Sequence, residues 1–176
     1  SCPMTMTPST MLELGTPLPA FELPDVYGTP VSSAQLHGAP ASLVVFLCPH
    51  CPYVRHVRKE FARFAVEYQA KGLRIIGINS NDNIAFPDDS PEGMRKEIAD
   101  AGYTFPYVID ESQEVAKLFH AACTPGIFLF DRDLKSAAMS DVNVDYDRDN
   151  KVVHLKGAVD SSAEKSRGED IAQGAI

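Results

Sequence analysis

The stretch Ser42-Leu-Val-Val-Phe-Leu-Cys-Pro-His-Cys-Pro52 decides how this chain folds. Residues 42–47 form a short, continuous apolar run with β-branched side chains, which is typical of a strand buried on both faces. A C-x-x-C motif, Cys48 to Cys51, follows directly. Beyond it, apolar residues recur at helical spacing, at Val54, Val57, Phe61, Phe64, Ala65 and Tyr68. The sequence therefore predicts a buried strand, a cysteine pair and an amphipathic helix in immediate succession.

The same alternation continues along the chain. Residues 73–79 predict a second strand, and Ser90 followed by Pro91 predicts the capped start of a helix that runs to about Ala101. Three further segments are expected: an extended one at 105–109, a short helix at 113–120 and a strand at 126–130. Strands that alternate with helices indicate an α/β fold.

A β-hairpin is expected on each side of this α/β core. In the first, residues 21–26 and a strand from Val31 flank a turn at 27–29. In the second, residues 142–146 and 151–155 flank a turn-rich segment, and one strand alternates with acidic residues. We expect residues 1–14 to be a flexible arm, residues 15–160 to form one domain and residues 161–176 to be a tail.

Charge and hydropathy exclude several classes of function. Lys and Arg number 16 against 24 Asp and Glu, so the formal net charge is -8. Phosphate repulsion then disfavours a nucleic-acid binder or a protein of anionic membrane surfaces. The longest apolar run, residues 39–48, is too short to cross a bilayer. No signal peptide is visible, which favours the cytoplasm, with the periplasm as the alternative if a signal peptide has been removed.

The position of a cysteine pair at a strand-to-helix junction favours thiol chemistry. Free N–H groups and the helix dipole stabilise negative charge at a helix start, and only a thiolate attacks. We therefore expect Cys48 to be the exposed, attacking cysteine and Cys51, one turn further on, to be the more buried resolving cysteine. Since Pro52 has no N–H, a helix that is capped near Cys51 with Pro52 at its first position is expected.

Several motifs in order resemble the thioredoxin-like superfamily, and among its branches the peroxiredoxin-like group of the alkyl hydroperoxide reductase/thiol-specific antioxidant family. These motifs are FLCPHCPYVRH (46–56), INSND (78–82), FPYVIDE (105–111), QEVAK (113–117) and ACTPGIFLFD (122–131). The resemblance covers about residues 10–131. It implies a thioredoxin-like fold, a central mixed β-sheet flanked by helices, with an N-terminal hairpin extension and an atypical C-terminal hairpin.

The resemblance also implies roles for individual residues. Cys48 would attack and Cys51 would resolve, while Thr124-Pro125 would match the loop with a cis-proline that lies against the cysteines and binds a docked peptide. Pro49-His50 is the dipeptide found between the cysteines of the bacterial periplasmic disulfide-forming oxidase. There, a histidine beside the thiolate would stabilise it and raise oxidising power, which favours an oxidising compartment.

Thiol chemistry of this kind requires no metal or organic cofactor. The implied partners are protein or small-molecule disulfides and thiols, together with a thiol reductant such as thioredoxin or glutathione. The leading hypothesis is therefore a thiol–disulfide oxidoreductase in which Cys48 and Cys51 exchange disulfides with a substrate.

Some positions depart from these families. Residues 41–47 contain no acidic residue, so the buried carboxylate of ordinary thioredoxins is not expected. Peroxiredoxins carry P-x-x-x-T/S-x-x-C around the peroxide-attacking cysteine. Aligned on Cys51, this pattern places Cys48 at the Thr/Ser position; aligned on Cys48, it places Val45 there. Neither alignment keeps the pattern, so a thiol peroxidase is the alternative hypothesis. Residues 132–147 look inserted.

Other interpretations stay open beside these. Cys123 is either a packing residue or a third redox thiol. His50 and His56 with the cysteines are a candidate Cu(I) or Zn(II) site, as in a metal-binding module without turnover. The cysteines would be inert in a purely structural protein. Arg55 or Arg58 is a candidate for stabilising the thiolate.

Two further patterns point to surface or packing roles. His37, His120 and His154 are expected at the surface or in packing. Residues 141–147 resemble a calcium loop, but they lead to Tyr146 at the sixth position and Val152 at the twelfth, where an EF-hand requires Gly and Glu. A solvated strand face is the interpretation that these departures favour.

Overall fold

The fold is that of a computed structural model, which describes residues 12–121, 124–138, 143–147 and 152–156. Its centre is a five-stranded mixed sheet with the strand order β5-β4-β3-β6-β7. The strands are β3 (Ala41–Phe46), β4 (Leu73–Asn79), β5 (Tyr107–Ile109), β6 (Gly126–Phe130) and β7 (Ser136–Ala137). The strands β3, β4 and β5 run parallel, whereas β6 runs antiparallel to β3 and β7 antiparallel to β6.

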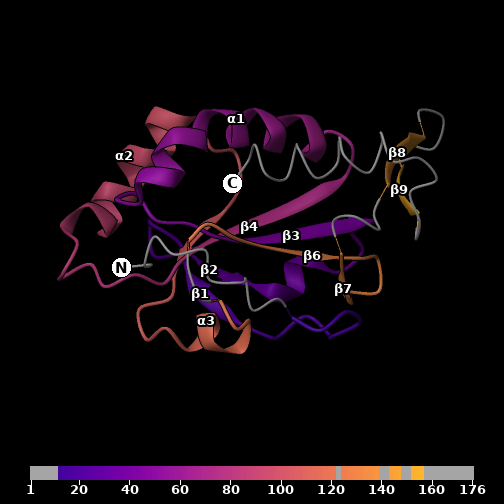
Figure 1. The fold of residues 1–176 in the computed structure, drawn as a ribbon, viewed down its shortest axis with the longest axis horizontal. Coiled ribbons are helices and arrows are strands. Elements are labelled where there is room, and N and C mark those ends of the chain that lie inside the picture. Colours follow the sequence, from indigo (N-terminus) through magenta and orange to yellow (C-terminus); the bar gives the residue numbers. More distant parts are fainter. Residues whose placement is uncertain (1–11, 122–123, 139–142, 148–151, 157–176) are drawn as a thin grey trace.

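Helices cover both faces of this sheet (Figure 1). The helices α1 (Pro52–Gln69) and α2 (Pro91–Ala101) lie on one face, and α3 (Glu114–Leu118) lies on the other. The predicted mixed sheet with flanking helices is thus confirmed. Two segments are shorter than expected, because only residues 107–109 of the stretch 105–109 pair with β4, and α3 ends before Phe119.

The central strand β3 is buried along its whole length, which explains why it is apolar at every position except Ser42. Its apolar residues alternate between two hydrophobic clusters. Leu43 and Val45 pack in the cluster that holds Phe61 of α1. Val44 and Phe46 belong to the cluster on the other face. A strand that is covered on both sides packs apolar side chains on both of its faces.

The predicted hairpins are both present. The strands β1 (Glu22–Pro24) and β2 (Pro30–Ser32) pair antiparallel, and β2 leads into the 3-10 helix η1 (Ser33–Leu36). Asp25 organises their turn by accepting the N–H groups of Tyr27 and Thr29 at 2.8 and 2.9 Å. The strands β8 (Asn143–Asp147) and β9 (Val152–Lys156) form the second antiparallel pair.

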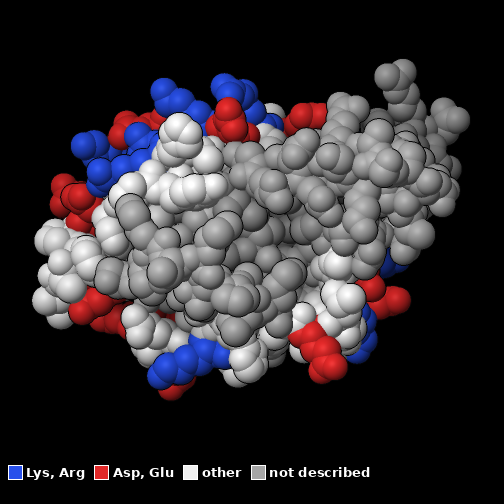
Figure 2. Space-filling model, viewed as in Figure 1, with Lys and Arg blue, Asp and Glu red and all other residues white. Residues whose placement is uncertain are grey.

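The surface over α1 and α2 is rich in both signs of charge. Figure 2 shows Lys and Arg with Asp and Glu among them along the edge where Figure 1 places these helices. The basic residues of α1 are at its solvent side, with Arg55, Lys59 and Arg63 exposed and Arg58 half-buried. Within the described residues, no helix combines the length and the apolar character needed to cross a membrane.

Candidate functional site

Cys48 lies where β3 gives way to α1. The strand direction continues for one residue past β3, because Leu47 N–H donates to the Ile78 carbonyl at 2.9 Å. The helix α1 then begins at Pro52, with Cys51 as its N-cap. This confirms the predicted start, in which a proline without N–H takes the first helical position. The cysteine pair therefore lies at the carboxyl end of the central strand, ahead of the first helical turn.

Thr124 contacts both sulfur atoms. Its Oγ1 is 3.2 Å from Cys48 Sγ, and its carbonyl oxygen accepts from Cys51 Sγ at 3.5 Å. The peptide bond between Thr124 and Pro125 is cis. Both cysteines are free thiols. Residues that are 73 and 76 positions apart in the sequence thus meet at one point, directly before β6.

The expected exposure of the two cysteines is wrong. Cys48 is fully buried, with 0% of its surface exposed, whereas Cys51 is only partly buried. The physical reason is that α1 starts only at Pro52, so Cys48 stays at the inner end of the strand rather than on the first helical turn. Cys51 instead occupies the rim of the site as the helix N-cap.

Burial also dominates the acidity of Cys48. It raises the pKa of this thiol to about 12, and the negative charge of Asp89 acts in the same direction. Hydrogen bonds from Thr124 and from the Cys51 backbone lower the pKa but do not compensate. The pKa of Cys48 thus shifts in the direction opposite to the acidification expected at a helix start, because desolvation of a thiolate is the largest contribution.

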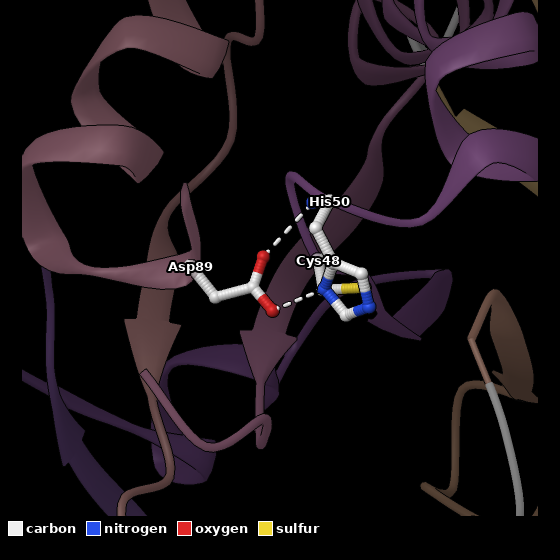
Figure 3. Close-up of side chains that lie close together, drawn as sticks. All are labelled: Cys48, His50 and Asp89. Carbon is white, nitrogen blue, oxygen red and sulfur yellow. Dashed lines mark hydrogen bonds and ion pairs between the residues drawn. The ribbon is translucent and has the colours of Figure 1, made fainter. Parts of the chain in front are cut away.

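His50 is fixed between the carboxylate of Asp89 (Figure 3) and the aromatic ring of Phe86. Its Nδ1 lies 2.5 Å from Asp89 Oδ2, and its backbone N–H donates to Asp89 Oδ1 at 2.9 Å. The imidazole stacks on Phe86, with 4.0 Å between ring centroids and an angle of 2° between the ring planes. Both the main chain and the ring of His50 are thereby held in one orientation.

Two asparagines hold Asp89 in turn. Asn81 Nδ2 donates to Asp89 Oδ2 at 3.0 Å, and Asn79 Nδ2 donates to the Asp89 carbonyl at 2.9 Å. The Asn79 side chain also accepts from the Asn81 backbone N–H at 3.0 Å. Asp89 ends the 3-10 helix η2 (Pro87–Asp89) and is only 2% exposed. The loop from the end of β4 to η2 is thus one hydrogen-bonded unit behind His50.

Sequence reasoning missed Asp89 and Phe86 entirely. Asn79 and Asn81 belong to the family-like motif of residues 78–82, but the motif by itself does not indicate what these two residues do. The only local clue to Asp89 is its place between Pro87 and the Ser90 helix cap. Its distance of 39 positions from His50 left no periodic pattern that could have paired them.

The site has buried carboxylates after all. Residues 41–47 lack an acid, as noted, but Asp89 from η2 and Glu97 from α2 are each only 2% exposed. Glu97 Oε1 accepts the Tyr107 hydroxyl at 3.3 Å. Burial raises the pKa of Glu97 to about 7, against the opposing effects of Tyr103, Tyr107 and Arg58. Two buried acids thus lie on η2 and α2 rather than on the central strand.

Glu97 also lines a cavity beside the cysteine loop. Its volume is about 280 Å³, and its walls come from the cysteine loop, α1, η2 and α2: Pro49, Arg55, Arg58, Asp88, Gly93, Lys96, Glu97 and Asp100. Arg55 spans one side of it, since its Nε donates to the Pro49 carbonyl at 2.8 Å and its Nη2 pairs with Asp88 at 3.0 Å. The cavity is therefore walled by charged side chains of both signs.

Only some of the residues predicted as metal ligands lie close to one another. Cys48, His50 and Asp89 have ligand atoms within 4.8 Å of one another, whereas His56 is exposed on α1 and is not in this group. The carboxylate oxygens of Asp89 already accept hydrogen bonds from His50 and Asn81. Both oxygens of Asp89 thus accept hydrogen bonds in this arrangement, and one of these bonds orients the neighbouring imidazole.

Two of the remaining predicted residues, His37 and His120, lie at the surface. His37 is exposed, and its carbonyl accepts from Arg74 at 2.8 Å. His120 is exposed with a positive φ of 54°. Cys123, and the side chains of His154 and of the calcium-like stretch 141–147, lie outside the described residues.

Comparison with known proteins identifies the family. The model of the AhpC/TSA family matches residues 14–138, which is more than half of the chain. The chain belongs to the AhpC/TSA family. Two strains of Mycobacterium tuberculosis each have a relative provisionally named a peroxiredoxin, 29% identical over 110 residues. The match covers 62% of this chain and 65% of each relative.

Solved structures agree on the fold of this AhpC/TSA protein. An uncharacterised conserved protein from Geobacillus kaustophilus is 39% identical, with a TM-score of 0.72, and the match covers 94% of this chain and 85% of that one. A secreted disulfide oxidoreductase from Mycobacterium tuberculosis is 13% identical, with a TM-score of 0.59 and coverage of 87% and 95%. The chain thus has the thioredoxin-like fold of the redoxins.

Proposed function

We propose that this protein is a thiol–disulfide oxidoreductase in which Cys48 attacks and Cys51 resolves. The Cys48 thiolate attacks one sulfur of a substrate disulfide, the substrate S–S bond breaks, and a mixed disulfide forms on Cys48. Cys51 then attacks Cys48, which releases the second substrate thiol. Two electrons pass from the cysteine pair to the substrate, and the reverse steps oxidise a dithiol.

The observation that carries this proposal is the contact of Thr124 with both sulfurs. It places two free thiols, three residues apart, against one backbone segment at the carboxyl end of the central strand. Cys51 at the rim is partly exposed, and we infer that a substrate disulfide reaches the buried Cys48 from this side, along the Thr124-Pro125 segment. Protein or small-molecule disulfides are the substrates of this proposal, and a thiol reductant closes the cycle without a cofactor.

A redox titration with cysteine variants tests the proposal. In glutathione buffers of graded potential, we expect one reversible Cys48–Cys51 disulfide by mass spectrometric mapping. Cys48→Ala should abolish exchange, while Cys51→Ala should accumulate a mixed disulfide on Cys48. The variant Cys2→Ala is the matched control and should leave the titration unchanged. Exchange that persists in Cys48→Ala would overturn the proposal.

A thiol peroxidase is the second candidate, and one contact favours it. Peroxide reduction uses a hydroxyl donor beside the attacking sulfur, and Thr124 Oγ1 lies 3.2 Å from Cys48 Sγ although the local Thr/Ser pattern is missing. The provisional name of the Mycobacterium relatives agrees with this activity. Under this candidate, hydrogen peroxide converts Cys48 to a sulfenic acid that Cys51 condenses to a disulfide, with water released.

Peroxide consumption separates the two candidates. A peroxidase should form sulfenic acid in Cys51→Ser within seconds at micromolar hydrogen peroxide, detected by dimedone labelling. An oxidoreductase without peroxidase activity should exchange disulfides rapidly while its Cys48 thiol stays unlabelled on that timescale.

A further inference from the structure

We propose that Asp89 is a positioning residue that orients His50, so that the imidazole accepts the proton of the Cys48 thiol. This inference rests on the proposed function and adds the group that activates its nucleophile. It concerns a residue that lies 41 positions beyond Cys48 in the sequence and that no motif indicated.

Cys48 needs a proton acceptor inside the protein. Its thiol is fully buried, and burial keeps it protonated at neutral pH, with a pKa of about 12. Only the thiolate attacks a disulfide. Because no part of the residue is exposed to water, the proton must leave by way of a neighbouring group.

The described neighbours of Cys48 point to His50 as the proton acceptor. The Thr124 hydroxyl forms a hydrogen bond with the sulfur, and this contact lowers the pKa of the thiol. Cys51 is itself a thiol, and Asp89 already accepts hydrogen bonds from His50 and Asn81. Among the described residues, the imidazole of His50 offers a ring nitrogen within 4.8 Å of Cys48 Sγ.

The contacts of Asp89 set both the orientation and the tautomer of that imidazole. An ionised carboxylate only accepts hydrogen bonds, so the proton in the 2.5 Å contact belongs to His50 Nδ1. The other ring nitrogen, Nε2, then carries the free lone pair of a base. In Figure 3 the imidazole lies over the Cys48 sulfur while its Nδ1 points to Asp89. A ring nitrogen of His50 lies within 4.8 Å of Cys48 Sγ, and catalytic contacts that are long in a free protein tighten when substrate binds.

Few charged groups compete for His50. The segment before α1 contributes Cys48 and Cys51, η2 contributes Asp89, and the loop after β4 contributes the neutral Asn81, 3.4 Å from Nδ1. Arg55 of α1 binds the Pro49 carbonyl and Asp88 instead. The ring face is covered by Phe86. The carboxylate of Asp89 is therefore the one ionic partner of the imidazole within the described residues.

The proton balance of the step is simple. The proton of Cys48 passes to His50, which leaves a thiolate beside an imidazolium whose second N–H remains on Asp89. The thiolate forms a bond to one substrate sulfur as the substrate disulfide breaks. The departing substrate thiolate takes the proton from the imidazolium, so His50 returns to its starting form.

Two effects of Asp89 have opposite signs, which makes the proposal testable. Its direct charge effect raises the pKa of Cys48 and disfavours the thiolate. Its effect through His50 favours the thiolate, because the carboxylate holds the imidazole in the orientation in which it accepts the proton. Removing the charge therefore speeds exchange if only the direct effect exists, and slows it if Asp89 works through His50.

A double-mutant cycle measures which effect dominates. We expect Asp89→Asn to slow the reaction of reduced protein with 5,5′-dithiobis(2-nitrobenzoate) at pH 7 by on the order of 100-fold. His50→Ala should slow it about as much, and the double variant should be no slower than His50→Ala alone. Asp88→Asn, an exposed carboxylate in the same 3-10 helix, is the matched control and should stay within about twofold of wild type.

Other outcomes would overturn the inference. A faster or unchanged Asp89→Asn variant would show that the direct charge effect dominates, and an additive double variant would show a merely structural role. In the unmodified protein, nitrogen NMR of reduced His50 should find the proton on Nδ1, and a proton on Nε2 would contradict the proposal without any variant. Retained exchange in Cys48→Ala would instead defeat the proposed function itself, so the two failures are distinguishable.

Discussion

Two sides of the Cys48 sulfur differ in chemistry. The Thr124 side is neutral and touches the sulfurs directly, through one hydroxyl and one carbonyl. The other side holds two buried acids, Asp89 and Glu97, and meets the cysteine loop through His50. Thr124 lowers the pKa of Cys48, whereas Asp89 raises it. The comparison teaches that the direct hydrogen bond on one side favours the Cys48 thiolate, whereas the carboxylate on the other side disfavours it and holds the imidazole of His50.

The largest expected effect is on the free energy of unfolding, and it concerns Glu97 on the side with the two buried acids. The pKa of Glu97 is about 7 in the folded protein and 4.5 for an ordinary glutamate, so the folded state binds this proton more tightly. The stability it contributes is fully present below about pH 4.5 and is lost as the pH rises through 7. In Glu97→Gln, the free energy of unfolding at pH 8 should exceed the wild-type value by on the order of 3 kcal/mol, with little difference at pH 4.5.

Urea denaturation at several pH values between 4.5 and 8 measures this effect. Glu92→Gln is the matched control, because Glu92 is an exposed acid in the first turn of the same helix. It should unfold with the pH dependence of wild type. A Glu97→Gln protein that is less stable at pH 8 would mean that the carboxylate is better paired than its burial indicates.

The neutral side should give a smaller effect on reactivity. Thr124→Val removes the hydroxyl that stabilises the Cys48 thiolate, so the pKa of Cys48 should rise further. A single hydrogen bond of this kind corresponds to about a 2- to 10-fold change in thiolate population. Iodoacetamide alkylation of Cys48 at pH 8 should slow accordingly. Thr124→Ser keeps the hydroxyl and should react like wild type; an equal loss in both variants would point to packing.

The smallest expected effect concerns the stacking of Phe86 on His50. Phe86→Ala removes a ring contact worth roughly 0.5–1.5 kcal/mol, so disulfide exchange should slow by about 2- to 10-fold at pH 7. Ile84→Ala, at an 89% exposed position of the same loop, should leave the rate unchanged. In a His50→Ala background the Phe86 effect should vanish. A loss that persists there would place Phe86 outside the His50 pathway.

The sequence predicted the parts of the site that are contiguous. The apolar run 42–47 and the helical spacing after Pro52 fixed a strand and a helix, because each period depends on neighbours only a few residues apart. The Thr124-Pro125 segment was found through a motif resemblance. The predicted exposure of Cys48 is wrong. Burial at the end of a strand depends on segments that are distant in the sequence, and a local sequence pattern does not indicate where those segments pack.

The sequence by itself determined the α/β architecture, the start of α1 at Pro52 and the cysteine pair at the end of a buried strand. Only the tertiary structure decided that Cys48 is inside and Cys51 at the rim, and that Asp89 holds the imidazole of His50. The physical reason is the distance in the sequence over which each interaction acts. Helix caps and strand periodicity are short-range properties, whereas desolvation and carboxylate–imidazole pairing arise when segments about 40 positions apart are packed around one sulfur.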